Sequence, residues 1–167
     1  RMGKHDSNHR LTSMTLADIE RRKQKRKQFL AEAKSIPLNT LNSADRLNLQ
    51  IFRRLLQDDV TEDTYPIHLI PISNRYGFHI SFPELYKQVP LKTVNDYENY
   101  ISRLRDFQRY TDEHITLLRK GIEAEWVLPS IVLEGYEGTI RPHIVSDATK
   151  SLLYTPFRKL PASFTRE

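Results

Sequence analysis

The longest helical pattern in the chain covers residues 93–122, TVNDYENYISRLRDFQRYTDEHITLLRKGI. Thr93 and Asp96 have the S/T-x-x-D spacing of a helix N-terminal cap, which predicts where this helix begins. Side chains suited to a buried face then recur every three or four positions, at Tyr97, Ile101, Leu104, Phe107, Thr111, Ile115, Leu118 and Ile122. We therefore expect one long helix over residues 94–122, with a length of about 42 Å at a rise of about 1.5 Å per residue.

Two further helices are expected before this one. Thr15 and Asp18 repeat the capping spacing, so a helix should begin near Thr15 and end before Pro37, because the residue before a proline avoids the α conformation. A second helix is expected over residues 43–59, where a wide apolar face is formed by Leu47, Ile51 and Leu55 at i, i+4 and i+8, together with Leu49, Phe52 and Leu56. This pattern predicts that the second helix is buried on a broad face.

The remaining segments are less regular. Four prolines between residues 60 and 92 exclude a long helix there, and the alternation of Phe78, Ile80 and Phe82 predicts a short extended or β segment near residues 68–82. A last helix is expected over residues 129–141, although its glycines each weaken it by about 1 kcal/mol. The predicted fold class is mostly α, a bundle of about four helices with one long helix over about residues 94–122 and the short segment near residues 68–82.

Composition bounds the class of protein. The chain has 167 residues, of which 38% are hydrophobic, and it contains no cysteine. Disulfides, thiol nucleophiles and cysteine-based metal sites are therefore excluded within this chain. No apolar run approaches the roughly 20 residues that a membrane-spanning helix needs. We expect residues 1–10 to be disordered or derived from an expression vector, and residues 11–167 to form a single helical domain that is the N-terminal part of a larger protein.

Basic charge is concentrated in one segment. The net charge is +5, and six of the seven residues from Arg21 to Lys27 are basic. Arg22, Lys23 and Arg26 are therefore candidates for binding anions, either the phosphates of nucleic acid or an anionic membrane surface. The simpler interpretation is a solvated helix face, and we favour it because aromatic side chains for base stacking are missing nearby. Nucleic acid is thus not the expected partner.

Catalytic and cofactor motifs are missing from the sequence. The six histidines include no H-E-x-x-H pair, and no G-x-G-x-x-G, P-loop or G-x-S-x-G motif occurs. The sequence therefore predicts no catalytic residue, no metal ligand and no cofactor in this chain.

Several stretches, in order, resemble the N-terminal region of a bacterial domain-of-unknown-function family, DUF885. They are Asp45-Arg46-Leu47-Asn48, Gly77-Phe78-His79, Phe82-Pro83-Glu84-Leu85, the stretch from Val94 to Tyr100, Leu128-Pro129, Leu133-Glu134-Gly135-Tyr136-Glu137 and Tyr154-Thr155-Pro156-Phe157. The resemblance implies a mostly helical protein of several hundred residues that is similar to zinc-dependent peptidases. In such proteins the H-E-x-x-H motif lies downstream of this region, and many carry an export signal of lipoprotein type.

The resemblance also implies a role for this chain. It would be a non-catalytic N-terminal portion that helps wall the substrate cleft of an envelope or periplasmic protein, with a cytoplasmic location left open. Zinc and a lipid anchor would belong to the parent protein, which could be a zinc-dependent peptidase. The partners would be the remainder of the parent polypeptide and a peptide substrate. The Pro-rich arm at residues 71–90 and the helix at residues 129–141 would face the cleft, with candidate substrate contacts at Arg75, His79, Tyr136 and His143.

Two alternatives remain open at this stage. The chain could be a stand-alone helical module that binds a protein partner through its apolar helix faces. It could also bind nucleic acid or an anionic membrane through residues 21–27, in which case binding should weaken steeply with salt and be lost when Arg22, Lys23 and Arg26 are replaced by glutamate.

Overall fold

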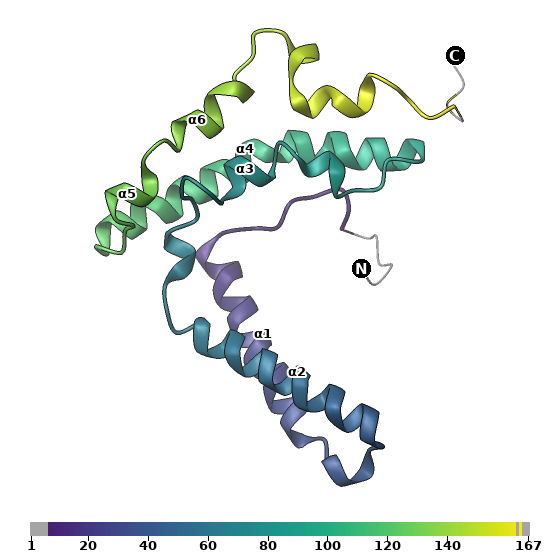
Figure 1. Cartoon of the computed structure of the whole chain (residues 1–167), viewed down its shortest axis with the longest axis vertical. Coiled ribbons are helices and arrows are strands. Elements are labelled where there is room, and N and C mark those ends of the chain that lie inside the picture. The colour runs from purple at the N-terminus through teal and green to yellow at the C-terminus, as the bar shows by residue number, and fades with distance from the viewer. Residues whose placement is uncertain (1–6, 163, 165–167) are drawn as a thin grey trace. The chain divides into compact units, whose positions relative to one another are not determined.

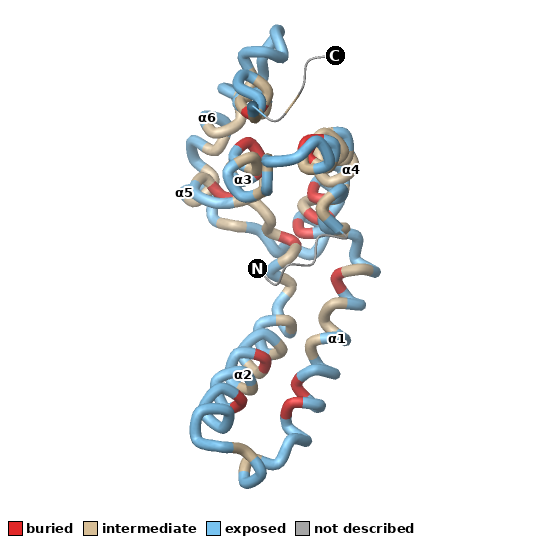
Figure 2. Tube along the Cα trace, turned by 90° about the vertical axis from the view of Figure 1, so that its right-hand side faces the viewer, coloured by how far each residue is buried: buried red, intermediate tan, exposed pale blue. Residues whose placement is uncertain are grey.

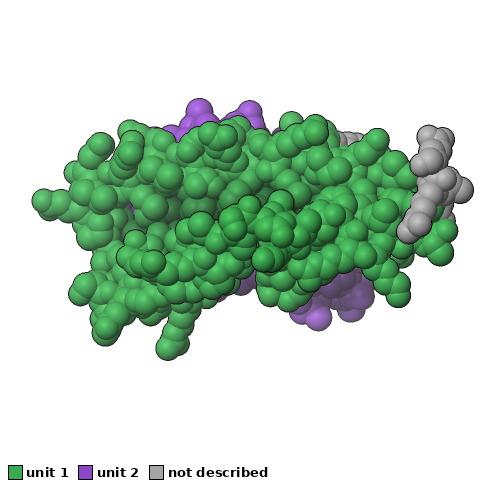
Figure 3. Space-filling view, turned by 90° about the horizontal axis from the view of Figure 1, so that it is seen from above, with its two compact units in different colours: residues 1–12, 70–167 green, residues 13–69 purple. Residues whose placement is uncertain are grey.

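The computed structural model describes residues 7–162 and 164. Contacts divide the chain into two compact units, one formed by Ser13–Leu69 and the other by Ile70–Glu167 together with the segment that precedes Ser13 (Figure 3). The mostly α fold is confirmed, because helices dominate both units and no strand occurs within residues 7–162. Most of residues 1–10, for which disorder is expected, lie outside the described part of the chain. Within the described part, the Arg10 N–H donates to the Ser7 carbonyl and closes a turn. No helix of the described chain is long and apolar enough to cross a membrane.

Residues 13–69, which are unit 2 in Figure 3, form a helical hairpin. Helix α1 spans Leu16–Ser35, a short 3-10 turn spans Leu38–Thr40, and α2 spans Ser43–Glu62. The two long helices lie side by side (Figures 1 and 2). Both expected helix starts are confirmed, because the Thr15 hydroxyl accepts the Asp18 N–H and the Asn42 side chain accepts the Asp45 N–H. The core of the hairpin is formed by Leu30, Ala33, Leu49 and Leu56.

The broad buried face predicted for α2 is wrong. Leu49 and Leu56 are buried, but Leu47, Ile51 and Leu55 are 57%, 50% and 58% exposed. Leu49 and Leu56 lie seven residues apart, or about two helical turns, so they form a narrow seam. Helix α1 covers this seam together with Leu38 and Leu41 of the connecting segment, and Figure 2 shows most of the rest of α2 as exposed.

Unit 1 of Figure 3, which we call the α4 unit, is organised around α4, Val94–Glu123. Its predicted start is confirmed by a capping box in which Thr93 and Asp96 bind each other's main-chain N–H groups. The predicted buried face is correct at Tyr97, which is 7% exposed, but the other buried positions are displaced by about one residue. Tyr100, His114 and Leu117 are 1%, 3% and 1% exposed, whereas Ile115 and Ile122 are 39% and 67% exposed. Polar contacts explain the shift, because the Tyr100 hydroxyl donates to the Leu153 carbonyl at 2.9 Å and His114 Nδ1 lies 2.7 Å from the Tyr110 carbonyl.

Of the extended or β segment predicted near residues 68–82, only an isolated bridge is found. Ile67–Leu69 is a 3-10 turn, Ile72 and Gly77 form an isolated bridge, and Phe78–Ser81 is the short helix α3. Alternating apolar residues at i, i+2 and i+4 include an i, i+4 pair, which one helical turn also places on one side. The Phe78 ring accordingly lies 4.2 Å from the His114 ring, and Phe82 stacks on Phe107 at 3.7 Å. The aromatic side chains of α4 therefore select the helical turn.

The single helix predicted over residues 129–141 is broken. It consists of α5, Ser130–Leu133, and α6, Glu137–Ile140, with Gly135 at a φ of 80° between them. The C-terminal segment returns to the start of α4, where the Tyr97 hydroxyl donates to the Pro156 carbonyl at 3.1 Å (Figure 1). The remaining elements are 3-10 turns at Leu85–Lys87, Arg141–His143, Ala148–Lys150 and Leu152–Phe157.

Candidate functional site

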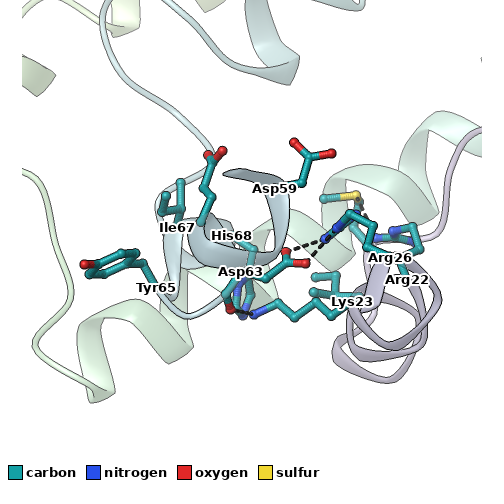
Figure 4. Close-up of a pocket in the computed structure, with 11 residues that line it drawn as sticks. Arg22, Lys23, Arg26, Asp59, Asp63, Tyr65, Ile67 and His68 are labelled. Atoms are coloured by element: carbon teal, nitrogen blue, oxygen red, sulfur yellow. Dashed lines mark hydrogen bonds and ion pairs between the residues drawn. The ribbon is translucent and has the colours of Figure 1, made fainter. Parts of the chain in front are cut away.

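A pocket of about 350 Å³ lies within the helical hairpin, between the first half of α1 and the end of α2 (Figure 4). Its lining contains three basic side chains, three acidic side chains, His68 and several larger apolar or aromatic groups. The charged residues are Arg22, Lys23, Arg26, Asp59, Glu62 and Asp63. All three residues predicted to bind anions are therefore gathered in one place, with an equal number of carboxylates.

Two of these cations bind Asp63, which caps the C-terminal end of α2. Lys23 Nζ donates to the Asp63 carbonyl at 2.7 Å, and Arg26 Nε donates to Asp63 Oδ2 at 2.7 Å. A second guanidinium nitrogen of Arg26 donates to the other carboxylate oxygen, and this hydrogen bonding raises the pKa of Arg26. We call Lys23, Arg26 and Asp63 the clasp. It places positive charge at the negative end of the α2 dipole, which stabilises the hairpin.

The third cation holds the start of α1. Arg22 donates to the Ser13 carbonyl at 2.8 Å, and its second terminal nitrogen lies 3.9 Å from the Met14 sulfur. Half of the basic run, Arg22, Lys23 and Arg26, thus makes contacts inside the hairpin. Asp58, Asp59, Glu62 and Asp63 form an acidic cluster of four residues at the end of the next helix, so the sequence shows the opposite charges but not which of them pair.

The pocket is close to neutral in net charge. Burial, followed by the nearby charge of Lys23, lowers the pKa of His68, so this histidine adds no positive charge near neutral pH. Within the described residues, no group of three or more histidine or acidic side chains is placed to hold a metal ion.

The four candidate substrate contacts lie in the other unit. Arg75 is exposed, His79 is buried, and Tyr136 and His143 are half-buried. The two segments that carry the first three do meet: the Asn74 N–H donates to the Val132 carbonyl at 3.0 Å, and α3 contacts α6. The structure therefore brings the Pro-rich arm against residues 129–141. Among the described contacts, no hydrogen bond or ring contact joins any two of the four candidates.

His79 has unusual surroundings for a polar side chain. It is 7% exposed, and neither of its ring nitrogens makes a hydrogen bond of good geometry within the described chain. The ring fills the space left by the missing side chain of Gly77, where an added Cβ would lie 2.7 Å from Nδ1. Burial lowers the pKa of His79, so the neutral form is the one that fits this space.

The stability of the α4 unit should decrease as the pH falls below about 6.5, the pKa of an unperturbed histidine. Burial lowers the pKa of both His79 and His114, so the unfolded chain takes up protons at a higher pH than the folded chain. The contribution is complete above the unfolded pKa and is lost as the pH falls toward the folded values. Urea unfolding followed by Trp126 fluorescence at about pH 7.5 and about pH 5.5 measures this loss.

A pair of variants tests whether His79 is a source of this pH dependence of stability. His79→Leu removes one buried titrating group and should reduce the loss of stability between the two pH values, whereas His9→Gln replaces an exposed histidine and should leave it unchanged. An equal loss in the wild-type chain and in His79→Leu would show that His79 is not a source of the effect.

The clasp should contribute measurably to the stability of the hairpin. Asp63→Ala removes both carboxylate acceptors of Arg26, and the free energy of unfolding of α1 and α2 should fall by about 1–3 kcal/mol, because a partly buried charge loses its partner. The Asp63 side chain is 12% exposed, whereas the exposed ion pair of Asp58 with Arg54 offers a control. Asp58→Ala should change the stability by less than about 0.5 kcal/mol. Amide hydrogen exchange of α1 and α2, resolved by mass spectrometry, measures both values, and equal effects would contradict the role of the clasp.

Comparisons with known proteins support one assignment. No curated protein and no solved structure matches the chain significantly. A family model described as "Bacterial protein of unknown function" matches residues 1–167. Because this match covers the whole chain, the protein belongs to the DUF885 family.

Proposed function

We propose that this chain is a non-catalytic helical portion of a zinc-metallopeptidase-like protein of the bacterial envelope, where it helps wall a substrate cleft. Membership of DUF885 is the starting point, and the resemblance to helical zinc peptidases supplies the expected context. The observation that carries the proposal is the apolar face of α2 formed by Leu47, Ile51 and Leu55, which we call the α2 stripe.

The α2 stripe is suited to contact with further polypeptide. Its three side chains are 50–58% exposed and recur at i, i+4 and i+8, so they lie on one face of the helix. Burying a leucine or isoleucine stabilises a complex or a fold by about 1.5–3 kcal/mol for the complete side chain. Contiguous apolar patches on soluble proteins commonly mark interaction sites. Further helices of a parent protein would cover this stripe.

The charge distribution favours an apolar contact over binding of a polyanion. Lys23 and Arg26 donate to Asp63, and Arg22 donates to the main chain, so the three candidate anion-binding side chains are already paired inside the hairpin, while Arg21, Lys25 and Lys27 are exposed. Phosphate binding by Arg22, Lys23 or Arg26 would have to compete with these hydrogen bonds. The α2 stripe has no such competing contact, and it equally supports the alternative of a stand-alone module that binds a protein partner.

The reading frame beyond the codon for Glu167 distinguishes these two functions. A continuous frame that encodes H-E-x-x-H supports the proposal, and the full-length protein should then cleave peptides only when zinc is present. An immediate stop codon overturns the parent-protein proposal and leaves the interaction module.

Association of separately expressed parts tests the α2 stripe itself. The chain and the downstream polypeptide, produced as two proteins, should form a complex that Leu47→Gln, Ile51→Gln and Leu55→Gln in combination weaken by about a hundredfold or more. Gln50→Ala, at an exposed polar position of the same helix, should leave the affinity unchanged. If the triple variant binds as tightly as the wild-type chain, then the stripe does not form the interface.

A further inference from the structure

The segment at residues 7–11 is held on α4 through its main chain, and it consists of a turn, closed by the Arg10 N–H and the Ser7 carbonyl, followed by Leu11. Residues 8–11, which we call the strap, belong to the same compact unit as α4. Arg103 Nε donates to the Asn8 carbonyl. The Leu11 N–H donates to Asp106 Oδ2 at 2.9 Å, and Arg109 donates to the Leu11 carbonyl at 3.3 Å. Side chains one helical turn apart therefore bind both polar main-chain groups of a single residue.

The groups that hold Leu11 are themselves fixed in place. Arg109 makes two hydrogen bonds of 2.7 Å to the Asp106 carboxylate and one of 2.7 Å to Glu113. Hydrogen bonding from Arg109 lowers the pKa of Asp106, so the acceptor of the Leu11 N–H is ionised near neutral pH. A network of this kind is preorganised, and preorganisation reduces the entropy lost when a ligand binds.

The contacts depend little on the sequence of the bound segment. Each of the three hydrogen bonds involves a main-chain N–H or C=O group of the strap. Every residue except proline has both of these groups. Binding through main-chain groups is one of the recurring ways in which proteins recognise peptides. Another peptide with an N–H and a C=O at the Leu11 position could make the same pair of hydrogen bonds.

A shallow and open depression on the surface of α4 adjoins this site. It has a volume of about 460 Å³ and shares Arg109 and Glu113 with the network that holds Leu11. Its other lining residues are Arg105, Gln108, Asp112 and Thr116. Because both signs of charge are present, a polar side chain next to the clamped residue would find a hydrogen-bond partner there.

We propose that Arg103, Asp106 and Arg109 form a main-chain clamp for a peptide that turns as residues 7–11 do, which the strap occupies in cis and a peptide segment of a partner protein occupies in trans. The strap is covalently attached, so its effective concentration at the clamp is on the order of millimolar. A partner peptide must displace it, and the strap therefore limits access to the clamp. This inference does not rest on the proposed function, because it uses contacts within the α4 unit alone.

A variant of the strap that leaves the clamp intact provides the test. Leu11→Pro in the full chain removes the N–H that donates to Asp106 without changing any residue of α4. The probe is a fluorescent peptide with the sequence of residues 7–12, SNHRLT, and its binding is followed by fluorescence anisotropy. The Leu11→Pro chain should bind this peptide at least about tenfold more tightly than the wild-type chain, because the competing strap is weakened.

Two controls identify main-chain recognition. The same peptide with N-methylated leucine keeps the side chain but lacks the N–H, and its affinity for the Leu11→Pro chain should be at least about tenfold lower. Asp106→Ala, added to Leu11→Pro, should abolish binding of the unmodified peptide, whereas Glu98→Gln, at an exposed position of α4, should not. Far-UV circular dichroism of each chain verifies that α4 is folded.

Three results would overturn the proposal. The folded Leu11→Pro chain could fail to bind the peptide at millimolar concentration, which would make the strap a structural element only. The N-methylated peptide could bind as tightly as the unmodified one, which would exclude main-chain recognition. The Asp106→Ala chain could retain full affinity, which would place the peptide elsewhere.

Discussion

Gly77→Ala should lower the free energy of unfolding of the α4 unit by about 3 kcal/mol, since a Gly-only backbone conformation and an overpacked side chain each cost about 1–3 kcal/mol. Gly77 has a φ of 138°, which residues with a side chain rarely adopt. An alanine Cβ would also lie 2.7 Å from the buried His79 ring and 2.9 Å from the Pro71 carbonyl. Neither neighbour can move freely, because one is enclosed and the other is main chain.

Urea unfolding followed by the fluorescence of Trp126 measures this effect, because Trp126 is the sole tryptophan of the sequence and lies in the same unit. Gly138→Ala is the matched control. A Cβ at Gly138 would meet no atom within 4 Å, and the residue lies in α6, so alanine should be neutral or stabilising by up to about 1 kcal/mol. A Gly77→Ala chain as stable as the Gly138→Ala chain would show that the segment at Gly77 rearranges without cost.

Leu117→Ala should destabilise the same unit by about 2–5 kcal/mol, the usual cost of truncating a fully buried leucine. Leu117 is 1% exposed on α4. Ile122→Ala, one residue beyond the next turn, should cost less than about 1 kcal/mol, because that side chain is 67% exposed. The comparison uses the same helix, the same kind of truncation and the same fluorescence reporter.

This pair of variants also tests the rotational position of α4. The regular spacing of apolar residues favoured a face that includes Ile115 and Ile122, and Leu117 was not among the residues expected to be buried. If Ile122→Ala proves the more harmful of the two, then the face inferred from periodicity is correct and the burial seen in the structure is not.

Contacts that were not apolar explain why periodicity failed on α4. Tyr100 and His114 are buried together with their polar atoms, which bind the Leu153 and Tyr110 carbonyls. A pattern based on hydrophobicity gives little weight to tyrosine and none to histidine. It therefore placed Ile115 and Ile122, and not Tyr100 and His114, on the predicted buried face of α4. The same limit applies to Phe78 and Phe82, whose spacing fits a strand and a helical turn equally well until the aromatic rings of α4 are present.

In the candidate site too, the sequence identifies individual residues, whereas only the tertiary structure shows which of them are in contact. The sequence identified Arg22, Lys23 and Arg26 as a basic group, and the structure does place them in one pocket. Their partner Asp63 lies 37 residues from Arg26 along the chain, and no local pattern connects the two. The strap could not be foreseen either, because the contact between Leu11 and Asp106 joins residues separated by 95 positions.

The amino-acid sequence by itself determined the mostly α class and the starts of the long helices. At Thr15, Asn42 and Thr93 a side chain binds an N–H group three residues ahead, and such a contact forms wherever the local chain is helical. Only the tertiary structure decided which helix faces are buried, where the basic run finds its acid and how α3 folds. The physical reason is that a cap is completed within one turn, whereas burial and ion pairing depend on which distant segment covers each face.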